Sequence, residues 1–217
     1  MNLVLLGPPG SGKGTLAKLL SSELKIPHIS TGDILREETK LGTCLGKKVK
    51  PFMEKGELVP DQIILEVMKE RIRKPDGQKG FLLDGFPRTI PQALGIDEML
   101  KESTKSIDWV LKLDVSEDRV LKRLGGRWIC SGCGAFFNLY TKPPQKELTC
   151  DFCGSKLYQR PDDAPEVILN RLKVYKEETL PIEEYYSKQG KLRKVNGELD
   201  PDSILKNVLN ILQLKNK

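Results

Sequence analysis

The sequence has one histidine, few aromatic residues and no long apolar run. Aromatic residues make up 6% of its 217 residues. No segment approaches the roughly 18 consecutive apolar residues of a membrane span, so we expect no membrane contact. The first apolar run has no basic lead-in and stops at Gly7-Pro8-Pro9, which is not the pattern of a signal peptide. We therefore expect a cytoplasmic protein.

The cysteine count and the charge narrow the class further. Five cysteines without an export signal argue against a disulfide framework. The length suits one packed core with an inserted lobe rather than two full domains. A net charge of +6 (36 Lys and Arg against 30 Asp and Glu) favours anionic partners, and both nucleotides and nucleic acids qualify.

Apolar strand patterns alternate with helix patterns along most of the chain. The helix patterns include one from Asp61 and one from Pro201, where Asp200 is placed to act as the N-cap. This alternation predicts βαβ units and a doubly wound parallel sheet of the α/β class, covered by helices on both faces. The predicted strands are residues 2–6, 26–29, 80–84, 108–114 and 192–195.

Two stretches interrupt the alternation. Residues 30–60 carry two helix patterns without a strong strand between them, and residues 126–163 carry four of the cysteines. Both stretches are expected to be insertions, so that the core is discontinuous and consists of residues 1–29, 61–125 and 164–217.

The segment GPPGSGKGT follows the first predicted strand and precedes a helix pattern, which is the context of a phosphate-binding loop. Backbone N–H groups and the helix N-terminus would face the anion, and Lys13 would add a positive charge. The usual motif has Ser or Thr after the lysine, whereas this chain has Gly14 and only then Thr15. A glycine-rich turn without a ligand is the alternative. The residues expected to bind phosphate are Gly10, Ser11, Gly12, Lys13, Gly14 and Thr15.

The predicted strand at 80–84 ends in Asp84. A carboxylate at the end of a parallel strand beside a phosphate loop can organise magnesium through water. The alternative is an aspartate that merely begins a turn.

The pairs Cys130-x2-Cys133 and Cys150-x2-Cys153 have the spacing of a tetrahedral zinc ribbon. Two disulfides and unliganded thiols are the competing readings. We expect the residues between the pairs to fold back as a hairpin, and the metal to be structural, because four cysteines leave no open coordination position. Cys44 is left over and is expected to be a small buried or half-buried residue.

Four motifs together, GPPGSGKGT, STGDILR at 30–36, KGELVPD at 55–61 and DGFPRTIPQA at 84–93, resemble the nucleoside monophosphate kinases, and among them the adenylate kinases of the long-lid bacterial type. The resemblance covers essentially the whole chain. It implies a five-stranded P-loop core with a helical monophosphate-binding insert at 30–60 and a small β-rich zinc lid at 126–163. It also implies ATP, AMP and ADP as substrates, Mg²⁺ with ATP, structural Zn²⁺ and a monomer.

The implied reaction is ATP + AMP = 2 ADP by in-line phosphoryl transfer with lid closure. The second pKa of a phosphate monoester is near ~6, so the attacking oxygen of AMP is largely deprotonated at neutral pH and needs no general base. His28, the single histidine, is therefore expected to be structural. The transferred group needs fixed positive charge instead. The resemblance assigns that role to Lys13, Arg88, Arg123, Arg127, Arg160 and Arg171.

The resemblance also assigns the two nucleotide sites. Asp33 and Asp84 would order water bound to magnesium, so the loop would need no hydroxyl at position 14. On the ATP side it adds Arg127, Phe136, Phe137 and Leu199 to the loop, although the two phenylalanines would equally suit the lid core. On the AMP side it gives Thr31, Arg36, Glu57, Leu58, Val59, Gly85, Phe86, Pro87, Arg88, Gln92, Arg160 and Arg171.

One departure from the family pattern and two alternative functions stay open. Trp128 stands where a second lid arginine is common, which places more demand on Arg127. A kinase of the same fold acting on UMP or CMP is one alternative, although Thr31 argues against it. The other is a zinc-ribbon nucleic-acid-binding ATPase. Residues 127–160 carry five Lys or Arg against two Asp or Glu, which is not a dense basic face, so no nucleic acid is expected.

Overall fold

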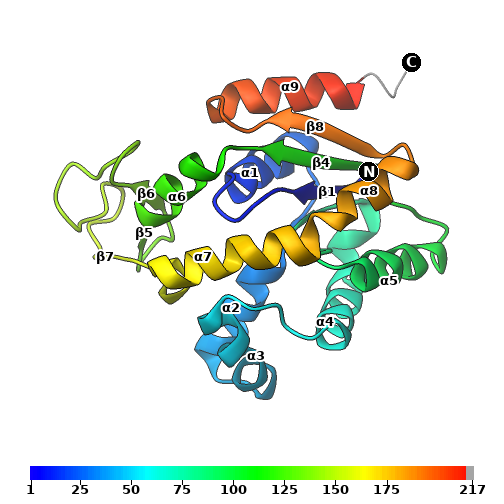
Figure 1. The fold of residues 1–217 in the computed structure, drawn as a ribbon, viewed down its shortest axis with the longest axis horizontal. Coiled ribbons are helices and arrows are strands. Elements are labelled where there is room, and N and C mark those ends of the chain that lie inside the picture. The colour runs from blue at the N-terminus through cyan, green and yellow to red at the C-terminus, as the bar shows by residue number, and fades with distance from the viewer. Residues whose placement is uncertain (214–217) are drawn as a thin grey trace.

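The computed structural model describes residues 1–213 and has an α/β core with two projecting parts (Figure 1). The central sheet of this described part has five parallel strands in the order β2-β3-β1-β4-β8. The doubly wound parallel sheet predicted from the sequence is therefore confirmed. The strands are β1 (Asn2–Leu6), β2 (His28–Ser30), β3 (Phe81–Asp84), β4 (Trp109–Asp114) and β8 (Leu192–Asn196).

Helices cover both faces of this sheet, and each face has its own apolar cluster. One cluster joins α1 and α9 to the strands, and the other joins α2, α3, α4, α5 and α8 to the opposite face. These helices are α1 (Lys13–Leu24), α2 (Thr31–Leu41), α3 (Cys44–Lys55), α4 (Asp61–Arg73), α5 (Ile90–Lys101), α8 (Pro181–Lys188) and α9 (Pro201–Gln213).

The apolar strand runs explain why the sheet forms. All five residues of β1 are buried, as a strand covered on both faces requires. The predicted strand at 26–29 lies slightly later in the structure, at His28–Ser30. The predicted N-cap of the last helix is confirmed, because the Ser203 N–H donates to Asp200 Oδ1 over 2.9 Å.

The first projecting part is the helix pair α2 and α3, which lies at the bottom of Figure 1. Ser30 and Thr43 cap the two helices with their hydroxyl oxygens, which accept from the N–H groups of Asp33 and Gly46. Cys44 is exposed here, contrary to expectation, because the buried face of α3 is carried by Gly46 and Val49 instead.

The second projecting part carries a small antiparallel sheet in the order β6-β5-β7. Its strands are β5 (Arg127–Cys130), β6 (Phe136–Asn138) and β7 (Leu157–Tyr158). The segment enters from α6 (Glu117–Gly125) and leaves through the short η2 (Pro161–Asp163) into α7 (Pro165–Val174).

The helix α7 continues through a π-helical turn, η3 (Tyr175–Thr179), into α8, and this run crosses the front of the molecule in Figure 1. The remaining element is the 3₁₀ turn η1 (Pro75–Lys79). Residues 214–217 of the predicted core segment lie outside the described part. No helix among residues 1–213 is long and apolar enough to cross a membrane.

Candidate active site

A wide cleft of about 970 Å³ opens at the carboxyl ends of the parallel strands, and a smaller pocket of about 80 Å³ adjoins it. The carboxyl edge is where parallel α/β sheets place their ligand sites. The wide cleft is lined by the glycine loop and by the lid strands, and the small pocket by α2, by residues 56–59 and by the start of α5.

The glycine loop joins β1 to α1, as its sequence context predicts. Gly10 has φ +77°, and a Cβ there would meet Leu124 Cγ at 2.7 Å. Gly12, with φ +100°, precedes the first residue of α1. Both positions therefore require glycine, and the loop leaves the N-terminus of α1 open toward the cleft.

The Lys13 ammonium folds back over this loop. It donates to the carbonyl oxygens of Gly7 and Pro8, each over 2.8 Å. Burial lowers its pKa to about 8, although the charge of Asp84 acts in the opposite direction. The loop carbonyls hold the ammonium until an anion with stronger charge reaches it.

Five guanidinium groups converge around the cleft and the small pocket. Burial and, to a smaller extent, neighbouring arginines together lower the pKa values of Arg88 and Arg160 to about 10. The pKa of Arg171 is lowered for the same two reasons. Clustered like charges are unfavourable without an anion, so this arrangement is a polyanion site. The five residues are Arg36, Arg88, Arg127, Arg160 and Arg171.

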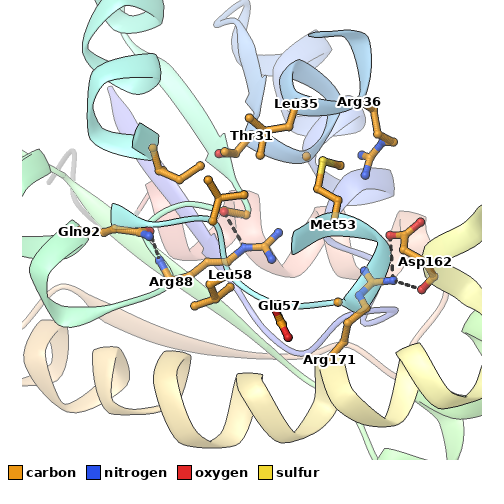
Figure 2. Close-up of a pocket in the computed structure, with 15 residues that line it drawn as sticks. Thr31, Leu35, Arg36, Met53, Glu57, Leu58, Arg88, Gln92, Asp162 and Arg171 are labelled. Carbon is orange, nitrogen blue, oxygen red and sulfur yellow. Dashed lines mark hydrogen bonds and ion pairs between the residues drawn. The ribbon is translucent and has the colours of Figure 1, made fainter. Parts of the chain in front are cut away.

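Three carboxylates lie within ion-pair distance of four of these arginines. Asp163 is fully buried and accepts from Arg127 Nε over 2.7 Å, and Arg171 lies 3.3 Å from it. Asp162 lies 3.0 Å from Arg171 (Figure 2). Asp33 accepts from Arg36 and lies 3.9 Å from Arg160.

Arg123 is separate from this cluster. Its guanidinium donates to the carbonyl oxygens of Ser11 and Gly197, at 3.0 and 3.1 Å. It therefore joins the glycine loop to the turn after β8, and both of these line the wide cleft.

The small pocket holds most of the residues predicted for the AMP side. Gln92 and Arg88 lie side by side in Figure 2, where Arg88 Nε donates to the Gly85 carbonyl over 2.8 Å. The Thr31 hydroxyl is buried and contacts the sulfur of Met68 at 3.6 Å. The predicted residues that line this pocket are Thr31, Arg36, Glu57, Leu58, Val59, Gly85, Arg88, Gln92 and Arg171.

Three predicted residues lie elsewhere. Phe86 is fully buried in the main core, so its side chain cannot face a ligand. Pro87 and Arg160 line the wide cleft.

The two lid phenylalanines are neighbours on β6 but differ in solvent exposure. Phe137 is 2% exposed and packs in the lid core, whereas Phe136 is 41% exposed. The Phe136 ring lies between Lys18 and Arg160, with Lys18 Nζ 4.7 Å and Arg160 Cζ 5.6 Å from the ring centroid. Of the two, Phe136 is the ring that a base can reach.

Asp84 lies at the end of β3, beside the glycine loop. A Cβ on Gly14 would lie 3.5 Å from Asp84 Oδ2, and His28 Nε2 lies 3.3 Å from the same oxygen. His28 therefore supports a carboxylate of the site, which is consistent with a structural role. Leu199 also lines the cleft.

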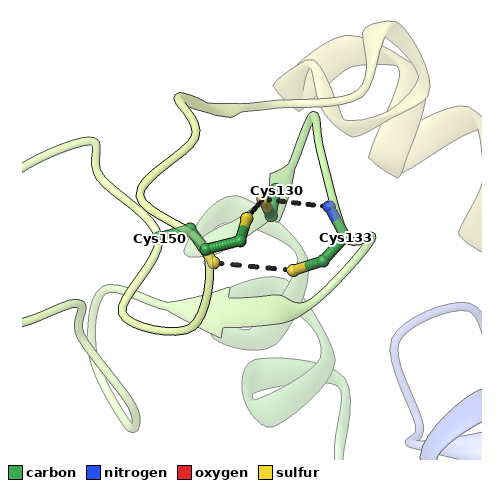
Figure 3. Close-up of side chains that lie close together, drawn as sticks. Cys130, Cys133 and Cys150 are labelled. Carbon is green, nitrogen blue, oxygen red and sulfur yellow. Dashed lines mark hydrogen bonds between the residues drawn. The ribbon is translucent and has the colours of Figure 1, made fainter.

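The four lid cysteines come together. Their Sγ atoms all lie within 4.8 Å of one another (Figure 3 labels three of them), so the cluster could hold a metal ion. The N–H groups of Gly132 and Phe152 point at Cys130 Sγ and Cys150 Sγ, as in metal-binding knuckles.

The residues between the two cysteine pairs fold back, as expected, where Asn138 and Lys142 form an antiparallel bridge. Each C-x2-C pair lies at the turn of its own short hairpin, one between β5 and β6 and one flanked by the bridge of Thr149 to Lys156. A hairpin turn brings its two sulfurs to the same side, which the longer intervening segment could not do alone.

Trp128 is partly buried against the lid core, so it is a packing residue at its position. Sequence reasoning missed Asp162 and Asp163, which pair with Arg127 and Arg171. Their signal is the pair of aspartates in RPDDAP at 160–165, directly after a predicted ligand.

The comparisons with known proteins agree with this site. The family model of adenylate kinase matches residues 5–191. The chain belongs to the adenylate kinase family. An adenylate kinase from Methanocella arvoryzae is 52% identical over 208 residues, covering 96% of each chain. Those from Thermosipho melanesiensis and Archaeoglobus fulgidus are each 51% identical over 213 residues, covering 98% of this chain and 100% and 98% of theirs.

The family match covers most of the described site. The matched region of the adenylate kinase model includes the glycine loop, the small pocket, the lid and all five clustered arginines.

Proposed function

We propose that this chain catalyses the reversible transfer of the terminal phosphoryl group of ATP to AMP, which gives two ADP. The observation that carries the proposal is the cluster of five guanidinium groups between the glycine loop and the small pocket. Two phosphate chains that meet end to end would place their highest negative charge there. The relatives named adenylate kinase, at about half identity, support the same reaction.

The wide cleft would hold ATP. The loop from Gly10 to Thr15 would surround its phosphates, and Phe136 and Leu199 would flank its base. Arg123 would brace the loop against the turn after β8 through its two bonds to backbone carbonyls, and its remaining N–H groups would be available to phosphate.

The small pocket would hold AMP. Arg36 and Arg88 would bind its phosphate, and Thr31 and Gln92 would face its base. Planar guanidinium groups bind phosphate oxygens in pairs, which fixes the direction of the attacking oxygen as well as its charge.

The chemistry then needs positioning more than proton transfer. The AMP phosphate is largely dianionic at neutral pH, so it attacks without a general base. Lys13 and the arginines of the cluster would stabilise the charge on the transferring group. Arg127 and Arg160 would arrive with the lid and exclude water, and Arg171 would meet them from α7.

The residues fit a magnesium ion bound with ATP. Asp84 lies near Gly14, contacts His28 and lines the wide cleft, where ordered water could reach its carboxylate. Asp33 is engaged with Arg36, and it would serve magnesium water only after that ion pair rearranges. Magnesium would neutralise phosphate charge and orient the two phosphate chains.

The residues also fit a structural zinc ion. Four sulfurs within 4.8 Å of one another match a tetrahedral thiolate site. Hydrogen bonds from the Ser155 hydroxyl and N–H lower the pKa of Cys153 to about 6, which favours the thiolate that a metal requires. We propose zinc as the metal, held away from the phosphates as a support of the lid.

We propose three functional parts with the boundaries expected from the sequence: the discontinuous core, the monophosphate insert at 30–60 and the lid at 126–163. The small three-stranded sheet of the lid and the helix pair α2 and α3 support this division. We further propose a cytoplasmic monomer that binds no nucleic acid. Light scattering would test whether the protein is a monomer, and a filter-binding assay in low salt would test whether it binds nucleic acid.

A monophosphate panel with ATP and Mg²⁺ tests the reaction. We expect ADP from AMP, at a kcat/KM at least tenfold above those for UMP and CMP. Efficient turnover of UMP or CMP would favour the alternative kinase, and no ADP from AMP would overturn the proposal. Metal analysis of the same sample should give one zinc per chain.

A further inference from the structure

The side-chain amide of Gln92 is bound at both ends. Gln92 is 2% exposed and lines the small pocket. Its Oε1 accepts from the Arg88 backbone N–H over 2.8 Å, and its Nε2 donates to Asp61 Oδ1 over 2.7 Å. Figure 2 shows the Gln92–Arg88 contact inside the pocket.

A third residue completes this network. The Thr89 hydroxyl donates to Asp61 Oδ1 over 3.0 Å, and its oxygen accepts from the Gln92 N–H over 3.2 Å. Asp61 is the first residue of α4, and Thr89 caps α5, so the network joins two helices on either side of the pocket. Asp61 itself does not line the pocket.

The chemistry of these partners fixes which way the amide points. A carboxylate oxygen only accepts, and a backbone N–H only donates. Reversing the Gln92 amide would place its oxygen against Asp61 and its NH₂ against the Arg88 N–H. Both contacts would be lost in a buried site, where an unpaired polar group is costly.

The fixed amide still has one N–H and one oxygen lone pair for a ligand. Adenine presents a ring-nitrogen acceptor beside its amino donor, which one amide can satisfy. Hypoxanthine differs from adenine on this edge alone: it has a carbonyl acceptor in place of the amino group and an N–H in place of N1. It therefore requires the reversed amide.

We propose that Asp61 is a positioning residue that sets base selectivity in the monophosphate pocket. It holds the Gln92 amide in the orientation that accepts a 6-amino purine and rejects a 6-oxo purine. This inference rests on the proposed function, because it assumes that the small pocket binds the base of AMP.

The variant Asp61→Asn tests the proposal, because asparagine can face the Gln92 amide with either an oxygen or an NH₂. It therefore removes the constraint that Asp61 imposes on the amide, while the Arg88 N–H is unchanged. The measurement is the ratio of kcat/KM for AMP to that for IMP, with ATP as donor. Where IMP turnover is below detection, the ratio of Kd values from calorimetry replaces it. We expect the ratio to fall about tenfold or more, with little change in KM for ATP.

Two controls separate orientation from loss of structure. Glu66→Gln removes a carboxylate from an exposed position of the same helix and should leave the ratio unchanged. In a Gln92→Ala background, Asp61→Asn should change the ratio less than twofold, because the amide it orients is gone. If Asp61→Asn does not fold, Asp61→Ser takes its place.

The outcomes are distinct. A ratio within twofold of the unmodified chain in a folded Asp61 variant would overturn the inference, as would an equal change in the Gln92→Ala background. Failure of the unmodified chain to phosphorylate AMP would count against the proposed function instead, and the Kd ratio would still test the orientation.

Discussion

The core sheet and the lid sheet are held together in different ways. The five core strands lie between two apolar clusters that draw residues from nearly every helix of the described chain. The lid sheet has strands of two to four residues and a buried cluster of Cys130, Phe137, Cys150 and Leu157. Half of that cluster is cysteine.

This difference indicates where each part obtains its stability. Apolar burial stabilises a sheet in proportion to the area removed from water, and the core has ample area. A three-stranded sheet whose buried cluster has four residues has little, so we expect it to depend on cross-links. The lid can thus be lost without unfolding the core, and four experiments test this separation, in decreasing order of expected effect.

Metal removal should have the largest effect. Chelation, or Cys150→Ser, should unfold the lid while the core keeps its far-UV circular dichroism. Structural zinc contributes on the order of 10 kcal/mol to small domains. We therefore expect proteolysis within 126–163 to accelerate at least about a hundredfold. Cys44→Ser is the matched control and should change nothing. Simultaneous unfolding of core and lid would contradict the separation.

The adjacent pair Phe136 and Phe137 should give the next largest effect. Phe137→Ala empties the lid core and should destabilise the lid by about 3 kcal/mol, measured by hydrogen exchange of β5. Phe136→Ala removes an exposed ring of the cleft and should raise KM for ATP several-fold without loosening the lid. Equal effects of both variants on exchange would show that the two faces of β6 are not distinct.

Arg127 tests the charge at the point where lid and core meet. Arg127→Ala should lower kcat more than tenfold, because the guanidinium both reaches the cleft and pairs with buried Asp163. Arg73→Ala, on the exposed surface of α4, is the matched control. A loss below threefold would mean that this lid contacts phosphate in another way.

The titration of Lys13 tests the phosphate loop of the core and should give the smallest of the four effects. Its pKa is about 8 in the free protein, so at pH 8.5 a substantial fraction has lost its proton. Phosphate favours the charged form, so ATP binding should take up a fraction of a proton, and affinity should fall as pH rises above 8. Calorimetry in two buffers of different ionisation enthalpy measures the uptake, and Lys13→Arg should abolish it.

The core was predictable because its signals are local. Continuous apolar runs predict buried strands. A glycine loop between a strand and a helix predicts an anion site from neighbouring residues alone. The cluster of four cysteines could also be predicted, because each C-x2-C pair is a local turn and only these two turns have to come together. The helix cap at Asp200 follows from neighbouring residues alone.

The residue pairs that form hydrogen bonds across the site could not be predicted from local sequence patterns. Asp61 and Gln92 are 31 residues apart, and Arg127 and Asp163 are 36 apart. No local pattern pairs such residues. The phase of β6 was also undetermined, because a three-residue strand is too short to show which phenylalanine turns inward.

The five convergent guanidinium groups also bear on whether the phosphoryl group of ATP is lost to water. Their mutual repulsion opposes a tightly closed cleft unless bound phosphates neutralise it. A single nucleotide brings only part of that negative charge, and two bring the rest. We expect the lid to close fully only on a complete pair of substrates, which denies water the chance to take the phosphoryl group in place of AMP.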